Sequence, residues 1–243
     1  MDLHGKGVLV TGGGTGTGQA VAVALAAEGC RVGITGRRAE KLQETVALGP
    51  REPAIELFPA DVADRDDVGR LMEWAAEKIG PIHILVNSAG INIRDRATKD
   101  LTPEDFDRLL DINCTGTFNV IWAVLPQMRE RQDGLIVNLS SVAGLRPSTL
   151  AGVGYSTAKA AVTALGCGVA LEEGAAGIRV TNLYPGEINT PILDERPEPV
   201  SEQQRAAMLQ PADLAATVIY LAKLPPHAHV PDLVIKPVGQ AFS

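Results

Sequence analysis

The chain has 243 residues, 45% of them hydrophobic, and this length and composition suit one large α/β domain with a full core. The formal net charge is -7 and Lys and Arg form no run, which makes nucleic acid and anionic membrane surfaces poor candidates as partners. No apolar stretch approaches the roughly 18 residues of a membrane span, and residues 1–6 do not resemble a signal peptide. We therefore expect a cytoplasmic protein.

The cysteines and histidines give no sign of a disulfide or a metal site. Cys30, Cys114 and Cys167 are an odd number with no paired spacing, so we expect buried, reduced side chains. The histidines are scattered, and His227 and His229 lie close together in a segment flanked by Pro. Their spacing is weak for metal ligands, and we predict no metal.

A glycine-rich turn follows the first predicted strand. Val8–Val10 is a short apolar run, residues 11–18 have the sequence Thr-Gly-Gly-Gly-Thr-Gly-Thr-Gly, and an Ala-rich helix is expected over Gln19–Glu28. Backbone N–H groups in such a turn, together with the helix N-terminus, bind a pyrophosphate. The alternative is a flexible turn, but its place directly after a strand favours a dinucleotide site.

The second predicted strand, Arg31–Thr35, runs into Gly36, Arg37 and Arg38. An acidic residue at this point binds the ribose 2′-hydroxyl of NAD, whereas arginines suit the 2′-phosphate of NADP. The alternative for the two arginines is a solvated helix start. We predict NADP(H) as the cofactor and keep NAD(H) as the second choice.

Strands and helices alternate along the chain at roughly thirty-residue spacing, which favours a doubly wound parallel sheet. No change of composition separates a second domain, and there is no internal repeat. We predict an α/β, Rossmann-type, three-layer fold with a mostly parallel sheet of about seven strands, formed by residues 1–243 as a single domain. The further strands are expected at residues 55–60, 82–86, 134–139 and 179–183, and a further helix at residues 66–79.

Another helix is expected to start with Thr102 as its N-cap and Pro103 in its first turn, and to continue through Gly116. Asn113 and Gly116 are poor helix formers in the middle of this run. Such breaks often mark a functional bend or a bound water. We therefore expect a functional distortion of the helix near Asn113.

Tyr155 and Lys159 stand four positions apart, so on a helix their side chains share one face. Lowering a tyrosine pKa from ~10 to ~7 requires about 4 kcal/mol, and a cation ~5 Å away in a closed pocket supplies on the order of 3 kcal/mol. The pair is then a proton donor for neutral pH; the alternative is an ordinary helix surface. Ser140 and Ser141 end the preceding strand, where open α/β sheets place their ligands.

The helix that contains Tyr155 is also rich in small residues. Gly166 and Gly168 each cost about 1 kcal/mol relative to Ala in a helix. Together with Ala160, Ala161 and Ala164 they predict a helix that packs very closely on another, across a subunit interface. We therefore expect a homodimer or homotetramer.

In their order and spacing, these features resemble the short-chain dehydrogenases/reductases, in their single-domain, NADP-preferring form. The resemblance covers nearly all of the chain. The residues that carry it are Thr11, Gly12, Gly16, Gly18, Asp61, Val62, Asn87, Ala89, Gly90, Asn113, Ser141, Tyr155, Lys159, Pro185, Gly186 and Thr190. Each motif is weak alone, but the ordered set is specific.

The resemblance implies four catalytic residues. Tyr155 would be the general acid/base, and Lys159 would lower its pKa and hold the nicotinamide ribose. Ser141 would donate a hydrogen bond to the substrate oxygen, and Asn113 would position a water in a proton relay. Ser140 stays open as a substitute for Ser141, because the spacing from Ser141 to Tyr155 is one position longer than is common.

The resemblance also implies the cofactor contacts. Asp61 and Val62 would contact adenine, Asn87 would brace the sheet near the ribose, and Ile188 with Thr190 would hold the carboxamide. The expected cofactor-binding residues are Gly12, Thr15, Gly16, Thr17, Gly18, Arg37, Arg38, Asp61, Val62, Asn87, Ala89, Gly90, Tyr155, Lys159, Pro185, Gly186, Ile188 and Thr190.

Some positions agree with the family and others depart from it. Arg37 matches the position that selects NADP. Ser88 replaces the more usual second asparagine, and Thr17 replaces an aliphatic residue; both changes look tolerable. Residues 233–240 resemble a branch of the family that includes hydroxy-acid dehydrogenases.

These features predict an NADP(H)-dependent oxidoreductase that transfers hydride between the nicotinamide and a carbonyl or secondary alcohol of a small substrate. The alternative is a non-catalytic NADP-binding regulatory or scaffold protein, although such a protein would be expected to lose Tyr155 or Lys159. A nucleotide-sugar epimerase or dehydratase is less favoured, because those chains carry a larger C-terminal substrate domain than residues 191–243 provide.

The substrate pocket is expected beneath a flap at about residues 187–210, which contain several prolines. Loops of this kind carry specificity and exclude water on closing. Arg94, Arg96 and Arg146 fall in loops beside the predicted site, so a carboxylate-bearing substrate is one interpretation of them. The other is that they are solvated or contact another subunit.

Overall fold

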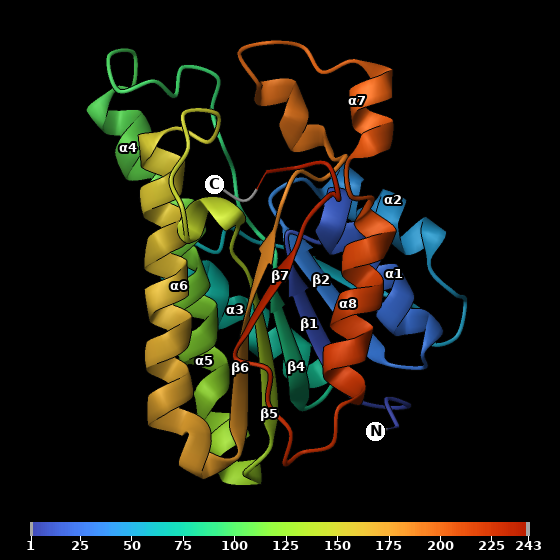
Figure 1. Ribbon diagram of the computed structural model, residues 1–243. Helices are drawn as coiled ribbons and strands as arrows, with labels where there is room; N and C mark the ends of the chain where they lie inside the picture. Colours follow the sequence, from blue (N-terminus) through green and yellow to red (C-terminus); the bar gives the residue numbers. More distant parts are fainter. Residues whose placement is uncertain (1, 242–243) are drawn as a thin grey trace.

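The computed structural model describes residues 2–241. Its seven strands form one sheet in the order β3-β2-β1-β4-β5-β6-β7, and every neighbouring pair is parallel (Figure 1). The strands are β1 Gly7–Thr11, β2 Arg31–Gly36, β3 Glu56–Pro59, β4 Ile82–Asn87, β5 Gly134–Leu139, β6 Ile178–Pro185 and β7 Asp232–Ile235. Because the order runs outward from β1 in one direction and from β4 in the other, the point where it reverses lies between these two strands. The predicted doubly wound α/β fold is confirmed.

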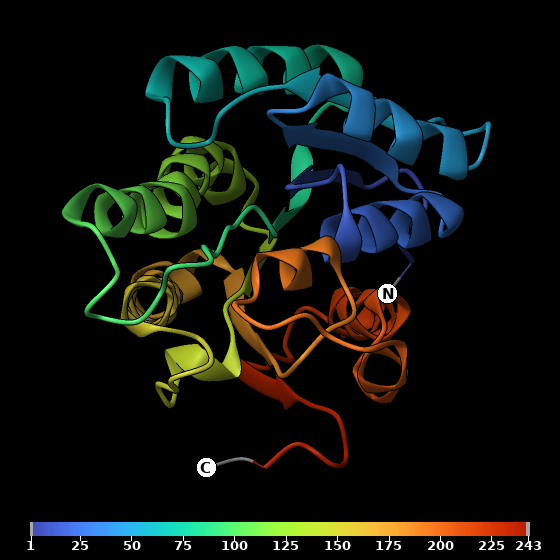
Figure 2. The ribbon, with the colours of Figure 1, turned by 90° about the horizontal axis from the view of Figure 1, so that it is seen from above.

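Helices cover both faces of the sheet (Figures 1 and 2). One face is covered by α1 Gly16–Ala27, α2 Ala39–Leu48 and α8 Pro211–Lys223. The other is covered by α3 Arg65–Lys78, α5 Gly116–Arg131 and α6 Val153–Glu173. The shorter helices are α4 Pro103–Leu110 and α7 Glu202–Ala207, which lie above the carboxyl edge of the sheet in Figure 1.

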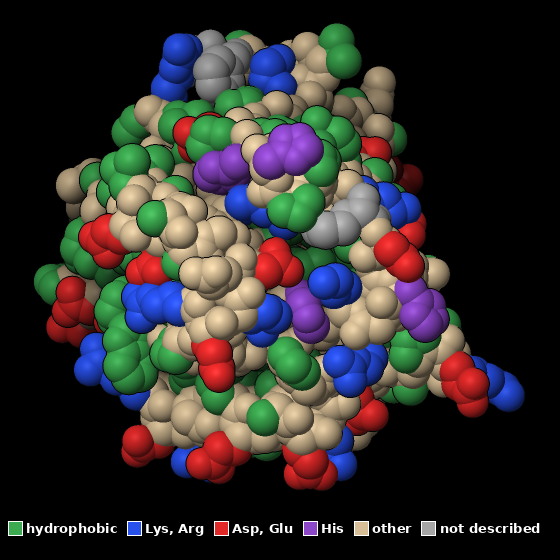
Figure 3. Space-filling model, turned by 90° about the horizontal axis from the view of Figure 1, so that it is seen from below, with side chains coloured by type: hydrophobic (Ala, Val, Ile, Leu, Met, Phe, Trp, Pro, Cys, Tyr) green, Lys and Arg blue, Asp and Glu red, His purple; other side chains and the backbone are tan. Residues whose placement is uncertain are grey.

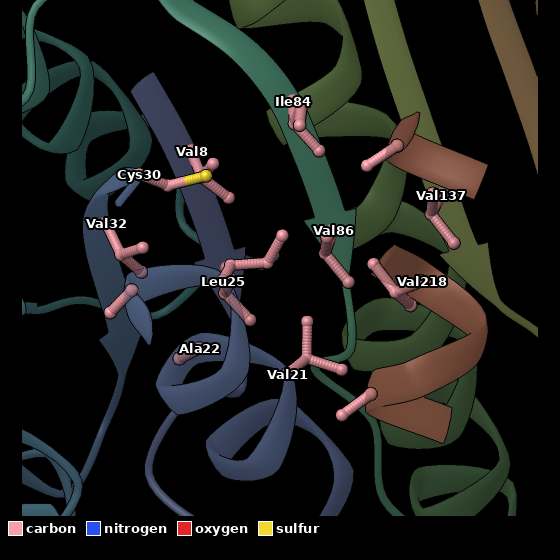
Figure 4. Close-up of a cluster of buried hydrophobic side chains, with 14 of the residues drawn as sticks. Val8, Val21, Ala22, Leu25, Cys30, Val32, Ile84, Val86, Val137 and Val218 are labelled. Atoms are coloured by element: carbon pink, nitrogen blue, oxygen red, sulfur yellow. The ribbon is translucent and has the colours of Figure 1, made fainter. Parts of the chain in front are cut away.

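The two cores follow from the alternation of side chains along the strands. Val8 and Val10 of β1 point into the core beneath α1 and α8, whereas Leu9 points into the core beneath α3 and α5. Figure 4 shows the first core, in which Val21 and Leu25 of α1 meet apolar side chains of the central strands. Burial on both faces explains why these strands are nearly continuous apolar runs in the sequence.

The helix predicted at Thr102 starts there. The Thr102 hydroxyl accepts a hydrogen bond of 3.1 Å from the Asp105 N–H, and Pro103 occupies the first turn. The α-helical geometry ends at Leu110, however, and a π-helix over Asp111–Thr115 precedes α5. The expected distortion is therefore an extra residue in one turn, a feature that often accompanies functional sites.

Gly166 and Gly168 on α6 have different surroundings. A Cβ on Gly166 would lie 2.0 Å from Oδ1 of Asn182 on β6, so this glycine lets α6 approach the sheet of its own chain. A Cβ on Gly168 would meet nothing within 4 Å. The close packing predicted for a subunit contact is thus an intrachain contact at Gly166.

The described cysteines are not all buried. Cys30 is buried as predicted, but Cys114 is half-buried and Cys167 is exposed, so the prediction of three buried side chains is wrong for the last. Within residues 2–241, no group of three or more His, Cys, Asp or Glu side chains is arranged to hold a metal ion. No helix in the same range has the length and apolar character needed to cross a membrane.

The amino edge of the sheet carries a mixed surface. Figure 3 shows this end from below, where Lys and Arg side chains are interspersed with Asp, Glu and His. The nearby ion pair between Lys6 and Asp133, at 4.0 Å, is of this kind. Such mixing leaves no single-sign field at this end of the molecule.

Candidate active site

A cleft with a volume of about 810 Å³ lies at the carboxyl edge of the sheet, the edge that Figure 2 views from above. The cleft is lined by most of the residues that the sequence singled out. They are Gly12, Thr15, Gly16, Thr17, Arg37, Arg38, Asp61, Val62, Ala89, Gly90, Asn113, Ser140, Ser141, Tyr155, Lys159, Pro185, Gly186, Ile188 and Thr190. Residues more than 170 positions apart are thereby brought to one site.

Gly18 and Asn87 do not line this cleft. A Cβ on Gly18 would lie 2.3 Å from the carbonyl oxygen of Gly12, so Gly18 allows α1 to pack against the turn before it. The Asn87 amide donates a 2.9 Å hydrogen bond to Asn138 Oδ1 on the neighbouring strand. Both residues therefore support the site without facing it, and for Asn87 this is the sheet-bracing position expected from the resemblance.

The glycine-rich turn forms one end of the cleft. Gly12 has a φ of +65°, and a Cβ there would lie 2.7 Å from the Ala89 nitrogen. The Thr11 hydroxyl accepts hydrogen bonds of 3.1 Å from the N–H groups of Ser88 and Ala89, which fixes the turn against β4. Any side chain at Gly12 would disrupt this close approach of two backbones.

The start of α1 is suited to an anion. Its N-cap residue, Thr15, makes no side-chain capping hydrogen bond, and the first turn holds no acidic residue. The N–H groups of this turn and the positive end of the helix dipole therefore face the cleft without a competing carboxylate. This arrangement fits the pyrophosphate of a dinucleotide.

Basic side chains gather where β2 ends. Arg37 and Arg38 are exposed and line the cleft, and Lys41, one helical turn further along, also lines it. Lys41 is not among the residues predicted from the sequence, although it follows Arg38 by three positions. Lys41 forms a 2.7 Å ion pair with Glu44. Arg37 and Arg38 line the same end of the cleft.

Tyr155 and Lys159 share one face of α6, as their spacing predicted. The Lys159 ammonium lies 5.7 Å from the centre of the Tyr155 ring. Lys159 is 6% exposed, and its Nζ donates a 2.8 Å hydrogen bond to the carbonyl oxygen of Leu139, at the end of β5. The pair thus faces the cleft and is tied to the sheet.

The electrostatics of this pair differ from the simple expectation. Burial raises the pKa of Tyr155 to about 12, and a hydrogen bond from Ser141 and the charge of Arg96 act in the opposite direction. Burial also lowers the pKa of Lys159 to about 8. Burial therefore opposes the charged form of each group, and Ser141 and Arg96 act to lower the pKa of Tyr155.

Ser140 and Ser141 face in different directions. The Ser141 hydroxyl accepts a 3.1 Å hydrogen bond from the Ala143 N–H, and Ser141 acts to lower the pKa of Tyr155. Ser140 is buried, and its hydroxyl donates a 3.0 Å hydrogen bond to the Lys159 carbonyl oxygen. Ser141 is therefore the serine whose hydroxyl lies beside the phenol, and Ser140 fixes the helix to the strand.

Asn113 lies in the π-helix and is fully buried. Its side-chain amide donates to the carbonyl oxygens of Ile91, at 3.1 Å, and Leu109, at 2.9 Å, and its Oδ1 accepts from the Ile91 N–H at 3.2 Å. A Cβ on Gly90 would lie 2.6 Å from this Oδ1 and 3.3 Å from Lys159 Nζ. Asn113 thus ties the loop after β4 to the π-helix beside Lys159.

The far wall of the cleft comes from residues that sequence reasoning missed. Glu187 and Arg196 form an ion pair of 2.9 Å, and the Gln240 side chain accepts a 2.9 Å hydrogen bond from the Glu187 N–H. All three line the cleft. The contact between Glu187 and Gln240 joins residues 53 positions apart, so no local sequence pattern predicts it.

The three arginines that the sequence placed beside the site separate in the structure. Arg96 is buried and lines the cleft. Arg94 is exposed and donates a 3.2 Å hydrogen bond to the Asp194 carbonyl oxygen, outside the cleft lining. Arg146 also lies outside the lining. Arg96 alone among the three is in a position to face a bound substrate.

These features define a dinucleotide-binding oxidoreductase, and comparison with known proteins identifies the family. Residues 6–201 match the family described as short chain dehydrogenase. The chain belongs to the short-chain dehydrogenase/reductase family. A nicotinamide cofactor serves the oxidoreductases of this family.

Relatives align over nearly the whole chain. An uncharacterized oxidoreductase of Staphylococcus saprophyticus is 33% identical over 243 residues, which cover 98% of this chain and 100% of that protein. The closed form of serine dehydrogenase complexed with NADP+ has a TM-score of 0.88 and 29% identity, covering 97% of this chain and 96% of the other. The 3-ketoacyl-(acyl-carrier-protein) reductase of Brucella melitensis, complexed with NADH, has a TM-score of 0.87 and 28% identity, covering 97% and 98%.

The burial of Lys159 predicts a pH-dependent contribution to stability. Its pKa is about 8 in the folded chain and 10.5 ordinarily, so between these values the unfolded chain binds more protons and stability rises with pH. Relative to Lys159→Met, the native protein should gain about 2 kcal/mol of unfolding free energy between pH 7 and pH 9.5. Urea unfolding of both proteins at the two pH values measures this difference. Parallel pH dependences would contradict it.

Proposed function

We propose that the protein is an NADP(H)-dependent oxidoreductase that transfers hydride between the nicotinamide and a carbonyl or secondary alcohol of a small substrate. Tyr155 is the general acid/base. The single observation that supports this most is the position of the Tyr155 hydroxyl. It lies near Ser141 and the buried Lys159, in the same cleft as the glycine-rich turn.

The chemistry divides between a cofactor and the chain's own residues. A bound nicotinamide supplies the hydride in the reductive direction and accepts it in the oxidative one. In reduction, Tyr155 donates its proton to the substrate oxygen and Ser141 stabilises the negative charge that develops there. Lys159, held by the Leu139 carbonyl oxygen, is placed to bind the ribose and to return a proton to Tyr155. Asn113 keeps the neighbouring loop in place, and its proposed further role is to position a relay water.

NADP(H) is the cofactor that the basic end of the cleft favours. Arg37, Arg38 and Lys41 all line it, and a 2′-phosphate would accept hydrogen bonds from such cations. The relatives differ here, since one is complexed with NADP+ and another with NADH. The proposal therefore rests on these three side chains.

We propose that residues 1–243 act as one domain in which residues 187–210 form a flap over the substrate. In the structure this segment contains a 3₁₀-helix, Pro191–Glu195, and α7. A bridge between Ile188 and Leu209 closes its base. Because Pro191 and Leu193 line the cleft, a change in the flap would change the substrate pocket.

The protein is proposed to be a homodimer or homotetramer. Phe118 and Trp122 on α5 are 42% and 68% exposed, and they stand one helical turn apart. Gly168, on the neighbouring α6, leaves open space beside its backbone. An exposed aromatic pair next to a small residue suits a helix–helix contact between two copies of the chain.

A reducing compartment such as the cytoplasm is the proposed location, because Cys30, Cys114 and Cys167 form no disulfide. Cell fractionation tests this proposal. Recovery of the protein from an oxidising compartment would overturn it.

Tyr155→Phe should lower kcat by about 10²- to 10⁴-fold, because it removes the proton donor while leaving the ring in place. NADPH binding, measured by fluorescence titration, should be unchanged. Tyr220→Phe, at an exposed position of α8, is the matched control and should keep full activity. Turnover by Tyr155→Phe equal to that of the native protein would contradict the role of Tyr155 as general acid/base.

Arg37→Asp should raise the KM for NADPH about tenfold and spare NADH, because the new carboxylate repels a 2′-phosphate and accepts a hydrogen bond from a 2′-hydroxyl. Arg51→Asp, at an exposed position outside the cleft, makes the same charge change and should not alter the ratio. The ratio of kcat/KM values for the two cofactors is the measurement. An unchanged ratio in Arg37→Asp means that the arginine does not contact the phosphate.

Trp122→Glu should shift the protein toward the monomer, because a charge would be buried in the proposed helix–helix contact. Sedimentation velocity measures the change. Leu48→Glu, at a 62% exposed position on α2, is the control and should leave the assembly unchanged. If Trp122→Glu sediments like the native protein, the contact lies elsewhere.

A further inference from the structure

Arg96 occupies an unusual place for a charged side chain. It is 7% exposed and lines the cleft. Its backbone packs on Gly152, where an added Cβ would lie 2.7 Å from the Arg96 Cβ. Gly152 is the N-cap of α6 and has a φ of +82°. Arg96 therefore sits against the first turn of the helix that carries Tyr155, at the substrate end of the cleft.

The charge of Arg96 has no carboxylate partner. Its Nη1 and Nη2 donate to the carbonyl oxygens of Leu150 and Glu195, and its buried Nε has no hydrogen-bond partner. Among the described residues, no acidic oxygen lies within 4.0 Å of it. A buried guanidinium that is bound only by neutral carbonyls is unfavourable, because it has left water without gaining an opposite charge.

The surroundings of Arg96 supply only part of that opposite charge. Arg196 lies close enough to oppose it, and its own carboxylate partner is Glu187, at 2.9 Å. The Glu195 side chain acts favourably on Arg96 but forms no ion pair with it. The N-terminus of α6, which has no side-chain cap and no acidic residue in its first turn, adds a further positive potential. Glu187 and Asp194, which also line the cleft, are paired with Arg196 and Arg205, so the guanidinium and this helix end still favour an anion beside Arg96.

We propose that Arg96 binds the carboxylate of the substrate, so that the enzyme acts on small oxo or hydroxy acids and not on neutral ketones and alcohols. This inference rests on the proposed function and names its substrate class. A guanidinium suits the task because two parallel N–H groups of its planar fork match the two carboxylate oxygens. Nη1 and Nη2 each carry a second N–H beside the one that donates to Leu150 or Glu195, and these are the donors for the carboxylate, which provides a charge that the protein does not place within 4.0 Å of Arg96.

A second role for Arg96 has to be separated from this one. Its hydrogen bonds to Leu150 and Glu195 also connect the loop before α6 with the flap, so its loss would loosen the flap for every substrate. Arg94 provides the matched control, because it bonds the same flap through the Asp194 carbonyl oxygen but lies outside the cleft lining. A flap contact affects acids and neutral substrates equally, whereas a carboxylate contact affects acids alone.

The kinetic experiment compares short hydroxy acids and oxo acids with their methyl esters, using NADP+ and NADPH. The native protein should have a kcat/KM about 10- to 100-fold higher for the acids, the range expected for hydrogen bonds to a charged group. Arg96→Met should lower kcat/KM for the acids about 10- to 100-fold more than for the esters and so remove this preference, Arg96→Lys should restore part of it, and Arg94→Met should preserve it. Equal turnover of acids and esters by the native protein, or an equal loss for both in Arg96→Met, would overturn the proposal.

A binding experiment separates this inference from the proposed function. Isothermal titration of the protein with butyrate and with butyramide, in the presence of NADP+, requires no turnover. Butyrate should bind at least about tenfold more tightly, and Arg96→Met and Arg96→Lys should weaken butyrate binding selectively. Such binding without turnover of any alcohol or ketone would support the anion site and contradict the proposed function. Equal affinity for butyrate and butyramide would contradict the anion site, whatever the turnover.

Discussion

The hydrogen bond from Lys159 Nζ to the Leu139 carbonyl oxygen, at 2.8 Å, is the interaction on which the site depends. It joins the helix that carries Tyr155 to the end of β5, and the Ser140 hydroxyl strengthens the junction by donating to the Lys159 carbonyl oxygen. Gly144 allows this approach, since a Cβ there would lie 2.7 Å from the same oxygen. With strand and helix fixed in this way, the hydroxyl of Ser141 meets the phenol of Tyr155.

Burial at this junction has electrostatic consequences that reach the substrate. It disfavours the charged forms of both Tyr155 and Lys159. Ser141 and Arg96 are the residues that partly offset this effect on Tyr155. A carboxylate bound to Arg96 would compensate the positive charge of the guanidinium, which otherwise lowers the pKa of Tyr155. Tyr155 would then stay protonated, as proton donation to a carbonyl oxygen requires.

The sequence predicted the parts of this structure that local patterns encode. Apolar runs on both sides of glycine turns indicated the parallel sheet, and the four-residue spacing of Tyr155 and Lys159 indicated their common face. Asn113 was recognised as a break, but not as part of a π-helix, because its bonds to Ile91 come from a distant loop. The burial of Arg96 was equally invisible, since it depends on the positions of Gly152 and the flap. Tertiary contacts determine the π-helix at Asn113 and the burial of Arg96, and the periodicity of the sequence does not predict them.

The central claim is that Tyr155 is the proton-transfer group of a cleft that binds an oxidised nicotinamide. Its ionisation can be measured directly from the phenolate absorbance of the native protein minus that of Tyr155→Phe, as a function of pH, with and without NADP+. The protein alone should give a pKa of about 12, and NADP+ should lower it below the ordinary value of 10.0, because the cationic ring favours the phenolate. A pKa that stays at about 12 when NADP+ is bound would contradict the account.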